Sequence, residues 1–95
     1  MQVEGLRAVA EPVRWEIVQA LRDGPRCACD LVEQLAIPAP LLSHHMKVLR
    51  AVEVVHARRL GRRVEYTLDL AALDALAGAV TGRVEPLVTA GRGVP

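Results

Sequence analysis

A change in periodicity near residue 54 most constrains what this 95-residue chain can fold into. The stretches 54–60 and 63–68 alternate in character, and the Gly61-Arg62 pair between them suits the two-residue type II′ turn of a β-hairpin. Before residue 54, apolar residues instead recur every three or four positions, which is typical of helices that each bury one face. The sequence therefore predicts one small domain in which helices precede a hairpin.

Four helices are expected before the hairpin. A short first helix covers about residues 3–10, and Pro12 ends it and suits the first turn of a second helix, which stops at Gly24-Pro25. In a short third helix, Asp30 is followed three residues later by Glu, which resembles a capping box with Asp in place of Ser or Thr. The fourth helix runs over about residues 40–52, with one apolar face and one polar, basic face.

Apolar residues recur at helical spacing again from about residue 70 to 90, which predicts a last helix. A terminal helix with so much apolar surface on a small domain favours a homodimer held through the terminal helices, and packing against the domain's own core is the alternative. Residues 91–95, rich in Gly and Pro, are expected to form a flexible tail.

Composition limits the classes of protein that remain. The chain is 52% hydrophobic but only 2% aromatic, with no Phe, so its core must be aliphatic. No apolar run approaches the roughly 18 residues that span a bilayer, and no secretory signal pattern is present, so we expect a cytoplasmic protein without a membrane partner. Cys27 and Cys29, separated by one residue, suit a thiol pair in a reducing compartment better than a disulfide framework.

Positive charge is concentrated in one segment of the chain. Residues 41–63 carry six basic side chains against one acidic side chain, whereas residues 1–40 and 64–95 each have a net charge of −2. On charge alone this segment could be an ordinary solvated face. It also contains the fourth helix and the hairpin, and that coincidence favours a surface that binds an anionic partner.

The order of elements is that of a winged helix-turn-helix domain, mainly α with a β-hairpin wing, over residues 1–90. Its recognition helix would cover about residues 40–52, its wing about 54–68 and its dimerisation helix about 70–90. A helix fits the major groove of DNA, and a basic hairpin beside it can reach phosphates. Double-stranded DNA is therefore the predicted partner.

Four strings of residues carry a resemblance to a known family. They are Glu11-Pro12-Val13-Arg14, Cys27-Ala28-Cys29-Asp30-Leu31, Leu42-Ser43-His44-His45-Met46-Lys47-Val48-Leu49-Arg50 and Gly61-Arg62-Arg63-Val64-Glu65-Tyr66. Over about residues 5–70 the chain resembles the arsenic-repressor (ArsR/SmtB-type) family of metal-sensing transcriptional repressors. The resemblance implies a winged-helix homodimer that occupies a palindromic operator until an ion binds and releases it.

The resemblance also implies which residues contact DNA. The base-facing residues would be Ser43, His44 and Lys47, and those on or near phosphates would be Arg50, Arg58, Arg59, Arg62 and Arg63. The adjacent His45 is rotated by about 100° on the helix and is expected to pack inside the domain. The start of the helix, Pro38-Ala39-Pro40, departs from the family pattern and removes a polar cap and a base-reading amide.

Cys27 and Cys29 match the thiolate motif of this family, which implies trivalent arsenic or antimony as the inducer and no organic cofactor. Thiolates are soft ligands that suit such ions. Residues two apart on a helix do not share a face, so ion binding is expected to unwind the first turn of the third helix and tilt the recognition helix. With only two cysteines in the chain, water, Asp30 or an exogenous thiol would complete the site.

Other functions are also compatible with parts of the sequence. The cysteine pair could be a redox switch in the same kind of repressor, or it could sense another soft metal. A thiol enzyme with Cys29 as nucleophile is disfavoured because the histidines lie on the predicted DNA face, and we expect no enzyme activity. A winged protein-interaction module that does not bind DNA is supported only by the Pro38-Ala39-Pro40 start. Family sites built from N-terminal cysteines or last-helix histidines lack their ligands here.

Overall fold

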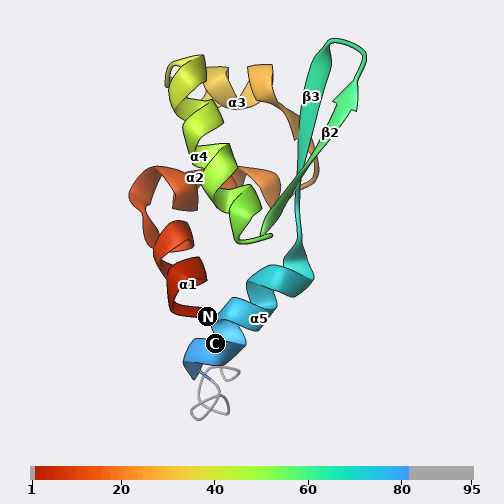
Figure 1. Cartoon of the computed structure of the whole chain (residues 1–95). Helices are drawn as coiled ribbons and strands as arrows, with labels where there is room; N and C mark the ends of the chain where they lie inside the picture. The colour runs from red at the N-terminus through yellow and green to blue at the C-terminus, as the bar shows by residue number, and fades with distance from the viewer. Residues whose placement is uncertain (1, 82–95) are drawn as a thin grey trace.

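Five helices and three short strands follow one another along residues 2–81, the part of the chain that this computed structural model describes. Their order is α1 (Gln2–Ala10), α2 (Pro12–Leu21), β1 (Arg26–Cys27), α3 (Ala28–Leu35), α4 (Ala39–Ala51), β2 (Val55–Leu60), β3 (Arg63–Leu68) and α5 (Leu70–Thr81). Helices α1 to α4 form a helical head, the β2–β3 hairpin projects beside it, and α5 returns to lie near α1 (Figure 1). The predicted fold, mainly α with a β-hairpin wing, is confirmed.

The hairpin forms at the predicted turn. Strands β2 and β3 pair antiparallel from Val55↔Leu68 to Leu60↔Arg63, which leaves Gly61 and Arg62 as the turn. Gly61 has φ +64°, whereas φ of Arg62 is not positive. A type II′ turn requires a positive φ at its first central residue and a negative φ at its second. Glycine at the first turn position therefore sets the register of the wing.

Strand β1 adds a third strand that the sequence does not predict. Its two residues pair antiparallel with β3, Arg26 opposite Tyr66 and Cys27 opposite Glu65, so that β3 is the central strand. Two residues are too short to show an alternating pattern. The pairing joins the start of α3 to the wing.

The turn between α3 and α4 is built without glycine. Ala36 ends α3 in the left-handed conformation at φ 55°, and its N–H donates to the carbonyl of Val32. Pro38 precedes α4 and offers no side-chain cap, which confirms the expected loss of a polar cap there. The turn brings α3 and α4 into contact, as in a helix-turn-helix.

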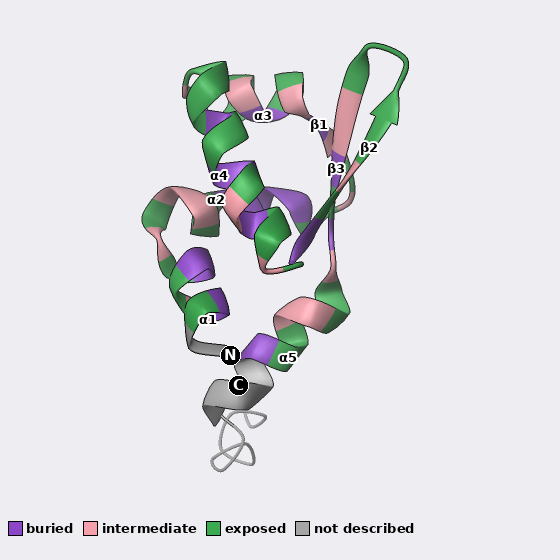
Figure 2. Ribbon diagram, in the orientation of Figure 1, coloured by how far each residue is buried: buried purple, intermediate pink, exposed green. Residues whose placement is uncertain are grey.

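The core of the head is aliphatic, as the composition predicts. Its largest fully buried side chains come from α2, α3, α4 and the residues that lead into the hairpin: Ile17, Leu21, Leu31, Met46, Leu49, Val18, Val54 and Val55. Along α4, buried segments alternate with exposed ones (Figure 2). Tyr66 also joins this core, whereas Trp15 is 45% exposed.

Helix α5 begins at an aspartate cap and packs against α1. The Oδ1 of Asp69 accepts a hydrogen bond from the Ala72 N–H at 2.9 Å. A Cβ on Gly5 would stand 2.7 Å from Leu76 Cδ2, so glycine allows the close approach of the two helices. The predicted 70–90 helix is confirmed over Leu70–Thr81, and its remainder and the 91–95 tail lie outside the described residues. Among the helices described, none has the length and apolarity to cross a membrane.

Candidate functional site

Helix α4 presents two different faces. Leu42, Met46 and Leu49 are buried against the core. The opposite face exposes the residues predicted to contact DNA from this helix, which are Ser43, His44, Lys47 and Arg50. The helical spacing of the sequence thus separates an anchoring face from a free polar face.

Shallow grooves flank α4 on both sides, and Lys47 borders each of them. One groove of about 500 Å³ lies toward the wing and is also lined by Arg50 and His56. The other, of about 530 Å³, lies toward α1 and includes Arg14 and His44. Basic side chains therefore border the exposed face of α4 on either side.

The wing carries the other four predicted arginines, and all of them are exposed: Arg58, Arg59, Arg62 and Arg63. Arg58 Nη2 lies 3.6 Å from Glu65 Oε1 across the β2–β3 pair. An exposed pair of this kind contributes little to stability.

The pair formed by His56 and Asp69 is not predicted by the sequence. His56 Nε2 donates to Asp69 Oδ2 at 2.8 Å, and this bond, ahead of the Ala72 N–H, lowers the pKa of Asp69 below its ordinary value. Asp69 also caps α5, so one carboxylate joins the wing to the last helix and orients His56 beside Lys47. The two residues lie 13 positions apart, and no local pattern links them.

His45 is buried, as predicted, and takes part in a polar junction of three helices. Its side chain is 8% exposed, and its Nδ1 accepts a hydrogen bond from Arg14 Nη1 at 3.1 Å. Arg14 Nε donates to the Ala8 carbonyl at 2.6 Å, and Glu11 Oε1 lies 4.0 Å from His45 Nδ1. Burial is the largest cause and lowers the pKa of His45. The charge of Glu11 opposes this lowering, and the charges of Arg14 and His44 add to it.

The lowered pKa of His45 makes folding stability pH-dependent. The unfolded chain binds a proton near the ordinary value of 6.5, before the folded chain does, so the free energy of unfolding falls as pH drops below that value. The carboxyl pKa values of Glu11 and Asp69 are also lowered. These groups reduce the free energy of unfolding only as the pH falls below their ordinary pKa values of 4.5 and 3.8. His45→Asn keeps an acceptor for Arg14. We expect this variant to show a smaller fall in the urea midpoint of unfolding between about pH 7.5 and about pH 5.5. An equally steep profile in the variant would contradict this assignment.

The cysteine pair lies where β1 passes into α3. Cys27 is the N-cap of α3 with an extended backbone, and Cys29 lies in the first turn. Their sulfur atoms are joined in a disulfide, with the Cα atoms 5.4 Å apart. The expectation that the two thiols must be brought together by unwinding the first turn is therefore wrong. Because Cys27 precedes the helix, its side chain turns back toward that of Cys29.

The cap of α3 also differs from the prediction. The Sγ of Cys27 accepts a hydrogen bond from the Asp30 N–H at 3.3 Å, so Cys27 takes the N-cap role assigned to Asp30. Asp30 instead lies in the first turn, where its charge suits the helix dipole. Ligand atoms of Cys27, Cys29 and Asp30 all lie within 4.8 Å of one another. Cys27 is buried, and the other two side chains are exposed.

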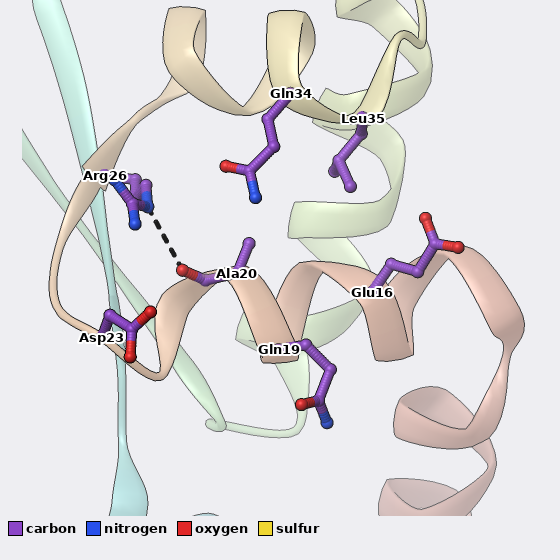
Figure 3. Close-up of a pocket in the computed structure, with 7 residues that line it drawn as sticks. All are labelled: Glu16, Gln19, Ala20, Asp23, Arg26, Gln34 and Leu35. Atoms are coloured by element: carbon purple, nitrogen blue, oxygen red, sulfur yellow. Dashed lines mark hydrogen bonds between the residues drawn. The ribbon is translucent and has the colours of Figure 1, made fainter.

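Two contacts fix the strand that carries Cys27. Arg26 Nε donates to the Ala20 carbonyl at the end of α2 at 3.2 Å (Figure 3). Figure 3 shows this bond at one side of a polar pocket of about 310 Å³ between α2 and α3. The pairing of Cys27 with Glu65 holds the other side. The thiol site is thus attached to α2 and to the wing as well as to α3.

Comparison with known proteins agrees with this geometry. Residues 11–57 match the family described as bacterial regulatory protein, arsR family. The HTH-type transcriptional repressor SmtB of Mycobacterium tuberculosis is 51% identical over 65 residues, 68% of this chain and 48% of that protein. The arsenical resistance operon repressor of Staphylococcus xylosus is 42% identical over 69 residues, 73% of this chain and 66% of that protein. The chain thus spans about half the length of the mycobacterial relative.

Solved structures share the fold. A crystal structure described as a possible transcriptional regulator for arsenical resistance superposes with a TM-score of 0.73 at 32% identity, covering 82% of this chain and 84% of that one. The homodimeric winged helix-turn-helix DNA-binding domain of Mb0332 from Mycobacterium bovis superposes with a TM-score of 0.72 at 23% identity, covering 93% and 83%. Sequence, fold and comparisons agree, and the chain belongs to the arsR family of bacterial regulatory proteins.

Proposed function

We propose that the chain is a cytoplasmic transcriptional repressor that binds operator DNA through α4 and the wing. The observation that carries this is the exposure of all eight predicted contact residues on one helix face and one hairpin. The family consists of regulators rather than enzymes, which agrees with the expectation of no enzyme activity. Ser43, His44 and Lys47 would contact base edges, and the arginines would contact phosphates.

A homodimer is the assembly that suits a palindromic operator. An apolar groove of about 550 Å³ between α1, α2 and α5 includes Trp15, Leu70 and Leu73. Leu76 also borders this groove but is buried against the chain's own α1, so α5 serves both the core and the groove. A second copy that covers the groove would present two recognition helices about one helical turn of DNA apart.

The reduced Cys27/Cys29 pair would take trivalent arsenic or antimony as the inducer. Two thiolates supply soft ligands, and the Asp30 carboxylate is close enough to be a third donor. The arsenical repressor among the relatives supports this choice of ion. Ligation at Cys27 would disturb the cap of α3, which contacts the recognition helix, and so lower operator affinity.

The test is fluorescence anisotropy or gel-shift binding to the DNA upstream of the chain's own gene, at fixed salt, with and without arsenite in the presence of a reductant. Tight binding that arsenite abolishes is the expected result. Tight binding that ignores arsenite would retain the repressor and reject the metalloid. No binding to any duplex would reject the repressor itself.

A redox switch is a second candidate, favoured by the disulfide between the two sulfurs. Peroxide would oxidise the exposed Cys29 thiol to a sulfenic acid with release of water. That acid would condense with the Cys27 thiol and release a second water. A peroxide titration that releases DNA while arsenite does not would select this candidate.

The wing should contribute to binding without regard to sequence. Arg62→Ala together with Arg63→Ala is expected to weaken binding to operator and scrambled duplexes alike, because phosphate contacts carry no base information. The slope of log affinity against log salt should fall by up to about 0.9 for each phosphate that the variant no longer neutralises. Anisotropy titrations over a range of salt measure this slope. A slope equal to that of the unsubstituted protein would remove these arginines from the interface.

A further inference from the structure

A small pocket brings the cysteine pair and the tip of the wing together. It has a volume of about 250 Å³ and is lined by Cys27, Ala28, Cys29, Arg62, Arg63 and Val64. The two arginines are exposed, and they come from an element far from the cysteines in sequence. This pocket is separate from both grooves that flank α4.

The backbone keeps these groups together. Cys27 pairs with Glu65 on β3, two residues beyond Arg63, so the wing cannot move freely past the start of α3. Glu65 itself faces Arg58 at 3.6 Å, and that arginine offsets its charge. The acidic group close to the sulfurs is Asp30, against the two arginines of the pocket. The pocket therefore has an excess of positive charge next to its thiols.

We propose that this pocket binds small disulfides that carry carboxylate groups. The bound disulfide oxidises the cysteine pair by thiol–disulfide exchange. Arg62 and Arg63 hold the carboxylates, and Cys29, whose side chain is exposed, attacks. The proposal does not depend on arsenic as the inducer, because it rests on the shared pocket, the charge and the exposure of one sulfur.

The exchange proceeds in two balanced steps. The Cys29 thiolate attacks one sulfur of the bound disulfide, whose S–S bond breaks, and one small thiolate leaves. The Cys27 thiol then loses its proton and attacks the Cys29 sulfur of the mixed disulfide, which releases the second small thiolate and closes the Cys27–Cys29 disulfide. The cysteine pair is oxidised by two electrons, and the small disulfide is reduced to two thiols.

The different environments of the two sulfurs determine which one reacts first with the bound disulfide. Cys27 is 5% exposed, and its Sγ accepts the Asp30 N–H, so a reagent in solution reaches Cys29 first. The Cys27 sulfur is in contact with that of Cys29, where the resolving step needs it.

The experiment compares two reagents on the reduced full chain, without DNA or arsenite. One is 5,5′-dithiobis(2-nitrobenzoate), which carries two carboxylates, and the other is neutral 4,4′-dithiodipyridine. The quantity is the ratio of their second-order rate constants at low ionic strength, measured by stopped flow. Arg62→Gln with Arg63→Gln should lower this ratio by about threefold or more, since steering by local charge acts on the anionic reagent alone. Added salt should lower the ratio of the unsubstituted protein in the same direction.

A matched control removes the same charge elsewhere. Arg50→Gln with Arg59→Gln also deletes two exposed arginines of the basic segment, and neither lines the pocket. This control should keep the ratio of the unsubstituted protein. An equal fall in both variants, or in neither, would overturn the proposal.

Single cysteine variants test the order of attack. Cys29→Ser should lose the fast reaction with both reagents, whereas Cys27→Ser should keep it, and its dependence on Arg62 and Arg63, and stop at the mixed disulfide seen by mass spectrometry. A fast reaction that survives in Cys29→Ser would overturn the assignment. Because no DNA or arsenite is present, these results are independent of whether the proposed repressor and its inducer are correct.

Discussion

Replacement of both cysteines by serine should leave operator binding within about twofold of the unsubstituted protein and abolish release by arsenite. Neither cysteine lies on the exposed face of α4, and Cys29 is itself exposed. Serine at position 27 can still accept the Asp30 N–H, because serine is among the best N-cap residues. Hydroxyl oxygens, in contrast, are hard donors and do not replace thiolates toward soft ions.

The readout is an anisotropy titration with arsenite on preformed protein–DNA complexes in the presence of a reductant. Cys29→Ser alone should abolish most of the response, since one thiolate and one carboxylate remain. Asp30→Asn provides the control for the third donor and should shift the arsenite midpoint without removing release. Release that persists in the double variant would place the sensor elsewhere, and loss of DNA binding in it would reject separate roles for the thiols and α4.

The second large effect is expected on the recognition helix. Ser43→Ala, His44→Ala and Lys47→Ala together should lower operator affinity by about a hundredfold or more, because each good base-edge contact contributes about 1–3 kcal/mol. Alanine preserves the helix, and the buried face of α4 remains intact. Affinity for scrambled duplex should fall much less, by the loss of the Lys47 charge alone.

The contrast with the wing variant makes this prediction specific. Loss of Arg62 and Arg63 should weaken binding to the operator and to the scrambled duplex alike. The α4 variant should instead reduce the ratio of operator affinity to scrambled-duplex affinity. Competition binding with operator and scrambled DNA measures that ratio directly. If the ratio is unchanged in the α4 variant, then α4 does not read bases.

Local sequence patterns predicted the elements whose determinants are local. Pro12 and Gly24 bound α2, Gly61 supplies the positive φ of the hairpin turn, and helical spacing correctly separates Leu42 from Ser43 on α4. The burial of His45 also follows from its rotation relative to His44. Each of these features depends on residues within about one or two turns of one another.

The features that the sequence did not predict depend on distant partners or on the chain's path. Strand β1 exists because Cys27 meets Glu65, and His56 is oriented by Asp69 across the wing. The cap of α3 was assigned to Asp30 from its spacing to Glu33, whereas Cys27 is the N-cap. The inference about unwinding was wrong because it placed both cysteines on the helix, and Cys27 precedes the helix. Ala36 adopts a left-handed conformation that usually identifies glycine or asparagine.

The bonds of Arg14 have a consequence for the geometry of an assembled dimer. One guanidinium within α2 bonds to α1 through Ala8 and to α4 through His45, so three helices are fastened at a single point. Lysine, with a compact ammonium, could not span both acceptors in the same planar arrangement. In the proposed dimer, a shift of α1 against the second copy would therefore be coupled through Arg14 to α2 and to the recognition helix. The spacing of half-sites that this dimer reads would then depend on how the two copies meet as well as on the residues that contact DNA.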